Sequence, residues 1–165
     1  AESTHALPDN GEIEEALRSY QSLYHGDEQR QRVAALRERA LAAMRKFAAF
    51  KPYLWGAVLK GTAGRYSDID LQLFTDDPKA VELFLLNNKL SYEAADERRR
   101  VGGQARAVTV LRLDWDGVTL NLSVYPANDE RVALRSASGE RLIERAGIDA
   151  VRELIAGQEL GVRDD

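Results

Sequence analysis

The sequence predicts a mixed α+β domain in which helices flank a small mixed or antiparallel sheet of about four to five strands. Apolar residues near the N-terminus recur at helical spacing, whereas two segments near residue 110 alternate apolar and polar residues with a period of two. The expected order is helices, two strands, a helix, a hairpin and helices, which is not a regular βαβ array. A length of 165 residues fits one domain, residues 1–165, with a buried core.

Residues 1–11 predict a flexible tail, and residues 12–50 predict the N-terminal helices. The helical spacing breaks at His25-Gly26, so we expect a short helix before this dipeptide and a long helix after it. Pro52 ends the second of these helices.

Residues 53–126 form the predicted sheet core. Its clearest feature is a hairpin, because residues 106–115 and 118–125 alternate with period two on either side of Asp116-Gly117, a strong turn signal. The other expected elements are strands over 53–59, 68–74 and 90–96, a helix over 79–88, and a mobile basic loop over 97–103. Residues 127–165 predict C-terminal helices over about 129–136 and 140–156.

Composition excludes several kinds of site. The chain has no cysteine and only two histidines, so it has no disulfide or catalytic thiol, and we do not expect a histidine-ligated zinc. A net charge of −4 argues against bulk DNA binding. No apolar run reaches ~18 residues, and the N-terminal segment is polar and acidic, so we expect no membrane partner and a cytoplasmic location.

Two aspartates, Asp68 and Asp70, interrupt the apolar run of the second predicted strand. At this spacing both carboxylates point to the same side of a strand, where they repel each other and lose hydration. A hard divalent cation relieves the repulsion, because Mg²⁺ prefers oxygen ligands and takes one or two carboxylates together with substrate phosphates. The residues just upstream suit a close backbone approach to an anion: Gly56, Lys60, Gly61, Gly64 and Arg65.

This stretch resembles the nucleotidyltransferase superfamily typified by DNA polymerase beta and the minimal nucleotidyltransferases. The family pattern is a Gly-Ser, an Arg-Gly pair, and a Ser-Asp-x-Asp in a strand, followed later by a third acidic residue. The corresponding residues here are Gly56-Ala57, Lys60-Gly61 and Ser67-Asp68-Ile69-Asp70, with Asn121 at the third acidic position. The resemblance covers about residues 28–126 and implies a nucleotidyltransferase fold.

The resemblance also implies an activity, the transfer of an NMP from an NTP such as ATP to a hydroxyl, with release of pyrophosphate. Asp68 and Asp70 would hold Mg²⁺ (or Mn²⁺), and Asn121 would complete the catalytic set. The implied nucleotide-binding residues are Gly56, Ala57, Lys60, Gly61, Arg65 and Ser67. The acceptor, whether protein, RNA or small molecule, is not identified, nor is an oligomeric state, although residues 127–165 are the expected acceptor surface.

Two departures from the family pattern support a second hypothesis. Ala57 lacks the hydroxyl that would bind a phosphate, a contact worth roughly 1.5–3 kcal/mol. Asn121 cannot accept a proton, and general-base catalysis is typically worth ~10²–10⁴-fold in rate. Under this second hypothesis, the chain is a catalytically degenerate module that binds a nucleotide or a protein. Asp114 is a nearby carboxylate, but it shares a strand face with Arg112 and Asp116 and is expected to face solvent.

Other interpretations stay open. The two aspartates could lie on the exposed face of an edge strand, or form the Asp-x-Asp of a metal-dependent glycosyltransferase. Lys60, Arg65 and the run Arg98–Arg100 could be solvated charges rather than phosphate ligands. Tyr66 could pack or stack on a base, and an antitoxin role is open because such pairs occur in this superfamily.

Overall fold

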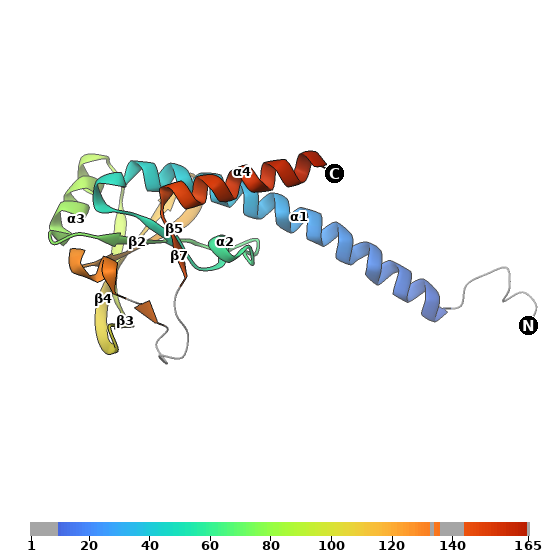
Figure 1. Cartoon of the computed structure of the whole chain (residues 1–165), viewed down its shortest axis with the longest axis horizontal. Coiled ribbons are helices and arrows are strands. Elements are labelled where there is room, and N and C mark those ends of the chain that lie inside the picture. Colours follow the sequence, from blue (N-terminus) through green and yellow to red (C-terminus); the bar gives the residue numbers. More distant parts are fainter. Residues whose placement is uncertain (1–9, 133, 136–143, 165) are drawn as a thin grey trace, which may run out of the picture.

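The computed structural model describes residues 10–132, 134–135 and 144–164, and shows helices packed on one face of a seven-stranded sheet (Figure 1). The elements, with η for a 3₁₀ helix, are α1 (Asn10–Lys46), η2 (Ala48–Phe50), β1 (Tyr53–Trp55), α2 (Ala57–Lys60), β2 (Ile69–Phe74), α3 (Pro78–Asn87), β3 (Tyr92–Val101), β4 (Gln104–Trp115), β5 (Val118–Tyr125), η3 (Ala127–Arg131), β6 (Leu134–Arg135), β7 (Arg145–Ala146) and α4 (Ile148–Asp164).

The sheet has the strand order β6-β3-β4-β5-β2-β1-β7. Only the central pair, β2 and β5, is parallel, and every other pair is antiparallel. The mixed α+β class is confirmed, and β1 to β5 supply the five longer strands that were expected. The two-residue strands β6 and β7 extend the sheet at its two edges, and pieces this short leave no periodic pattern in a sequence.

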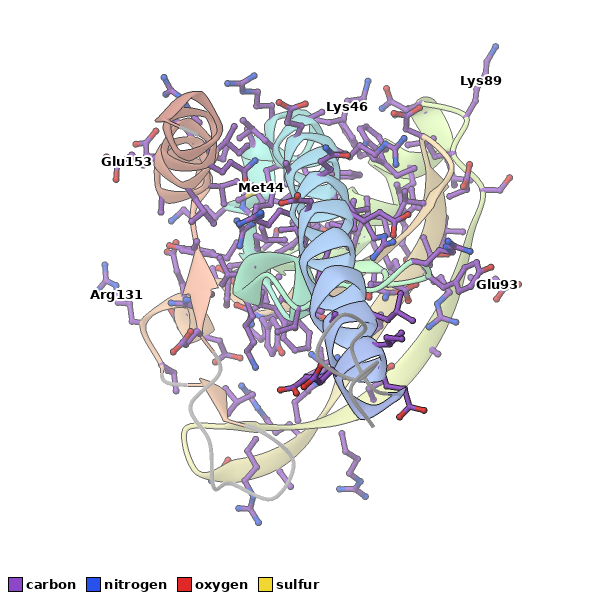
Figure 2. The ribbon with its side chains drawn as sticks, turned by 90° about the vertical axis from the view of Figure 1, so that its right-hand side faces the viewer. Met44, Lys46, Lys89, Glu93, Arg131 and Glu153 are labelled. Atoms are coloured by element: carbon purple, nitrogen blue, oxygen red, sulfur yellow. The ribbon has the colours of Figure 1, made fainter. Side chains whose placement is uncertain are left out.

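The main core lies between the sheet and α1, α3 and α4. Alternate residues of β2, namely Ile69, Leu71 and Leu73, are fully buried in it. Figure 2 shows Met44 of α1 inside this layer, whereas Glu93 and Glu153 point outward from the molecule. The core therefore fixes β2 from one side, and the intervening residues of β2 point to the opposite face.

The predicted break at His25-Gly26 is wrong, because α1 runs without interruption from Asn10 to Lys46. A glycine inside a helix costs only about 1 kcal/mol relative to alanine, which the long flanking turns outweigh. In Figure 1, the N-terminal half of α1 extends away from the sheet. Residues 1–9 of the predicted tail lie outside the described residues, and residues 10–11 belong to α1.

The mobile basic loop predicted over 97–103 is also wrong. Most of it is strand β3, and only Gly102-Gly103, with φ of +59° and +83°, turns the chain into β4. Pairing with β4 holds the basic residues in an extended conformation. Arg98, Arg99 and Arg100 lie opposite Ala107, Arg106 and Ala105, respectively. The first predicted strand ends earlier than expected, at Trp55, because Gly56 adopts a φ of +80° and begins the turn into α2.

The C-terminal segment differs from the two helices that were predicted. Residues 127–131 form η3, short strands follow at β6 and β7, and one helix, α4, closes the chain. Part of the predicted segment, residues 136–143, lies outside the described residues. Within the described part of the chain, none of the helices has the length and apolar character needed to cross a bilayer.

Candidate active site

Asp70 lies in the middle of the sheet, on the face away from the main core. Its neighbours in register are Trp55 on β1 and Asn121 on β5. Asp68 directly precedes β2, after a turn that Ser67 closes by accepting a hydrogen bond from the Gly64 N–H at 2.7 Å. The parallel pairing of β2 with β5 thus places the predicted third position beside the two aspartates.

One side chain links the two carboxylates. The Asn121 Nδ2 atom donates to Asp68 Oδ2 at 2.9 Å and to Asp70 Oδ1 at 3.0 Å. The aspartates therefore converge on a single nitrogen instead of separating into solvent, and the interpretation of an exposed edge strand does not fit, because β2 is a central strand.

Arg112 is a residue of this site that sequence reasoning missed. Its Nε donates to Asn121 Oδ1 at 3.1 Å, and its Nη2 lies 3.8 Å from Asp68 Oδ2. This contact directs the amide oxygen of Asn121 toward Arg112 and the amide nitrogen toward the carboxylates. A signal was available, because a two-residue turn at Asp116-Gly117 places Arg112 opposite Asn121.

Burial raises the pKa of Asp70, and the neighbouring charge of Asp68 raises it further. The hydrogen bond from Asn121 and the charge of Arg99 oppose these effects without cancelling them. The ionised form of Asp70 is therefore disfavoured in the folded protein, and a bound cation would restore it.

The glycine turn, residues 56–61, lies against Asp70. A Cβ atom on Gly56 would lie 2.7 Å from Asp70 Oδ2, and the φ of +80° also favours glycine. Ala57 begins α2 and packs against the main core, and Gly61 ends α2 at a φ of +83°. Because Gly56 has no side chain, the backbone of the turn can lie close to the Asp70 carboxylate.

Arg37 of α1 holds this turn in place, and no local pattern predicts this role. Its Nε and Nη2 donate to the carbonyls of Val58 and Leu59 at 3.0 and 2.7 Å, and its Nη1 donates to Gln158 of α4 at 3.0 Å. Burial lowers the pKa of Arg37. The Arg37 guanidinium binds carbonyls at the end of α2 that have no partner within that helix, and it connects the turn to α1 and α4.

The remaining predicted residues differ in position. Lys60, at the end of α2, and Arg65, in the following loop, are exposed, whereas Ser67 is half-buried and engaged with Gly64. Asp114 is exposed and pairs with Thr119 in register, whereas Arg112 pairs with Asn121. Of these, Ser67 lies directly before Asp68, in the turn that leads into β2.

Arg99 belongs to the run Arg98–Arg100, for which the sequence left solvated charges and phosphate ligands as alternatives. It lies on the same face as Asp70, where its Nη1 donates to Ser123 Oγ at 3.2 Å and to the Tyr125 hydroxyl at 3.0 Å. Its guanidinium also lies 4.9 Å from the centre of the Trp55 ring. Arg99 is therefore a fixed component of the sheet face and not part of a solvated loop.

The donor set fits one divalent cation better than two. Asp68 and Asp70 offer oxygens that already converge on one point, which matches a Mg²⁺ ion held by two carboxylates and substrate phosphates. Among the described residues, no group of three or more His, Cys, Asp or Glu side chains could hold a metal. The third position carries an amide whose oxygen is engaged by Arg112.

No family model and no curated protein sequence matches this chain. Among solved structures, the chain is similar to a cytoplasmic RNA terminal U-transferase, with a TM-score of 0.36 and 19% sequence identity. The similar region covers 59% of this chain and 29% of that one. The chain thus spans less than a third of that protein, and a likeness this distant carries no argument about its function.

Proposed function

We propose that this chain is a Mg²⁺- or Mn²⁺-dependent nucleotidyltransferase that moves an NMP from an NTP, such as ATP, to an acceptor oxygen. One observation carries the proposal: two carboxylates converge directly beside a glycine turn that leaves no room for a side chain. A cation and a triphosphate account for both features, since the cation needs the carboxylates and the phosphates need open backbone. The cytoplasmic location remains part of this proposal.

Within the proposal, Asp68 and Asp70 hold the cation, which when bound would neutralise charge on the triphosphate. Gly56 and Ala57 present open backbone to the phosphates, and Arg37 keeps this backbone in position. Ser67 shapes the turn before Asp68, because its hydroxyl is already occupied by the Gly64 N–H. The exposed ammonium group of Lys60, at the end of α2, attracts the triphosphate.

A second candidate function is favoured by Asn121. Its amide bridges the two carboxylates, and Arg112 adds a positive charge beside Asp68, so the site is partly neutralised without a metal. Such a site suits a degenerate module that binds a nucleotide or a protein without turnover.

The deciding experiment incubates the protein with Mg²⁺ and each α-³²P-labelled NTP and measures pyrophosphate and labelled product. The proposal predicts turnover in the native chain and none in Asp70→Asn. Where the acceptor is a hydroxyl, it also predicts faster turnover in Asn121→Asp, by up to ~10²-fold, because that variant restores a proton acceptor. Asn121→Ala is the matched control, since it removes the amide without adding a carboxylate. Mg²⁺-dependent binding of NTP with no turnover in any of these proteins would overturn the transferase and support the binding module.

A further inference from the structure

A cavity of about 420 Å³ lies at the end of the sheet where the neighbouring strands β2 and β5 begin. Its walls come from α1, from the loop before β2, and from the start of β5 together with the turn that precedes it. The residues that matter for its chemistry are Arg32, Arg39, Arg65, Tyr66, Asp68 and Thr119. Its volume is in the range of small-molecule sites, and Asp68 connects it to the carboxylate pair.

Three arginines and one carboxylate give this cavity a positive lining. Arg39 pairs with Asp116 at 3.4 Å on the surface, an exposed contact of little strength. Arg32 and Arg65 form no ion pair with any residue whose side chain the structure describes. Guanidinium groups bind phosphate with paired, directional hydrogen bonds, so the lining suits a phosphate group.

The cavity and the glycine turn lie on opposite sides of β2. The turn follows β1, the cavity is bounded by β5, and these two strands flank β2 in the sheet. Asp70 lies beside the turn at Gly56, whereas Asp68 lines the cavity. In an in-line displacement, the attacking and leaving oxygens lie on opposite sides of the phosphorus. If the leaving pyrophosphate occupies the turn, the cavity lies on the side of attack.

The third position restricts the attacking group. An attacking hydroxyl must lose a proton, and Asn121, with its oxygen held by Arg112, cannot accept one. A phosphate monoester differs, because its second ionisation lies near pH ≈ 6, so its oxygen is already anionic at neutral pH. The missing carboxylate and the arginine-lined cavity therefore favour the same kind of acceptor.

We propose that the cavity binds a phosphate monoester and that one of its oxygens, instead of a hydroxyl, receives the NMP. A bond forms between that oxygen and the α-phosphorus, the bond from the α-phosphorus to the bridging oxygen of the β-phosphate breaks, and pyrophosphate leaves with that electron pair. No proton transfer is required, and the product is a diphosphate diester. This inference rests on the proposed transferase function. Tyr66, which is 89% exposed at the cavity rim, can pack against the organic part of the ester.

Binding is tested first, by calorimetry without metal, using ribose 5-phosphate and unphosphorylated ribose as probes. Ribose 5-phosphate should bind the native chain, ribose should not, and Arg32→Gln and Arg65→Gln should each weaken binding by about tenfold or more. Arg98→Gln is the control, because Arg98 is an exposed arginine outside the cavity and should leave binding unchanged. Absence of ribose 5-phosphate binding, or equal binding in all variants, overturns the proposal.

Transfer is tested second, with Mg²⁺, α-³²P-labelled ATP, and either ribose 5-phosphate or an oligoribonucleotide with a free 3′-hydroxyl. The label should enter the ribose 5-phosphate product only, and the rate should follow ionisation of the phosphate and become flat above about pH 7. A labelled oligoribonucleotide would overturn this inference and leave the transferase intact, as would binding of ribose 5-phosphate without transfer to it. If no NTP binds with Mg²⁺ or turns over with any acceptor, the transferase itself fails.

Discussion

The two faces of the sheet share the same strands but differ in what their buried side chains contact. Toward the helices, β2 presents Leu71 and its alternate neighbours to an apolar core. Toward the other face, the same strand presents Asp70 and Gln72, of which Gln72 is fully buried. The first face stabilises the fold, whereas the second carries polar groups whose burial costs free energy.

The cost of the second face is visible at individual atoms. Both amide atoms of Gln72 and the Trp55 Nε1 are buried and have no hydrogen-bond partner among the described residues. Each such group costs about 1–3 kcal/mol. Buried polar groups next to Asp70 are what the proposed function predicts for this face, because binding sites often retain groups that lower stability. The predictions below test this contrast, from the largest expected effect to the smallest.

The helix-covered face should be the more sensitive to truncation. Leu71→Ala leaves a cavity in the main core and should lower the free energy of unfolding by about 2–5 kcal/mol in chemical denaturation. Leu83→Ala is the control, because Leu83 on α3 is 58% exposed and its truncation should cost no more than about 0.5 kcal/mol. Equal losses in the two variants would show that the core is misplaced.

Gly56→Ala tests how closely the glycine turn approaches Asp70. The variant should lose about 1–3 kcal/mol of unfolding free energy, since the new Cβ meets Asp70 Oδ2 and the φ is unfavourable. Gly103→Ala has nearly the same φ, +83°, but open space around the Cβ, so it measures the backbone strain alone. If Gly56→Ala lowers the free energy of unfolding no more than Gly103→Ala does, the Asp70 carboxylate does not lie close to Gly56 in solution.

Gln72→Met should stabilise the protein by about 1–2 kcal/mol in chemical denaturation, because it removes an unpaired buried amide while keeping the side-chain length. Gln104→Met, at an exposed position of β4, should change the free energy of unfolding by less than about 0.5 kcal/mol. Destabilisation by Gln72→Met would indicate that the amide has a partner that the described contacts omit.

Asp70→Asn should raise Tm at pH 7 by about 2–4 °C, as expected for a gain on the order of 1 kcal/mol. The folded state raises the pKa of Asp70 above its ordinary value of 3.8, so the stability from its protonated form is complete below pH 3.8 and is lost as the pH rises through the folded pKa. At pH 7 the ionised carboxylate therefore destabilises the fold, and the gain from asparagine should vanish near pH 3.

Asp114→Asn, at an exposed position, is the control and should leave Tm unchanged at both pH values. A lower Tm for Asp70→Asn at pH 7 would contradict the assignment of Asp70 to a functional face.

The sequence predicted the parts of the site that depend on local spacing. Asp68 and Asp70 share a side because strand residues alternate, and Asn121 lies beside them, as the family pattern implies. The register of the hairpin also predicts that Arg112 lies opposite Asn121. Arg37 could not be found, because an arginine that contacts a turn 21 residues away has the same local pattern as a solvated one.

The fold was predicted least well where two weak local effects compete. Gly26 suggested a helix end, but a single glycine costs less than the adjoining helical turns contribute, so α1 continues. The arginines of β3 suggested a loop, but pairing with β4 holds them in a strand. Tertiary contacts decided both cases, and neither the spacing nor the composition of the segment contains them.

Calorimetric titration with Mg²⁺ and a non-hydrolysable NTP tests the central claim most directly. The native chain should bind the Mg²⁺–nucleotide complex, and Asp70→Asn, although more stable, should lose the Mg²⁺-dependent part of this binding. Equal Mg²⁺-dependent binding by both proteins, or none by the native chain, would contradict the claim that the two aspartates and the glycine turn form one site for a cation and a triphosphate.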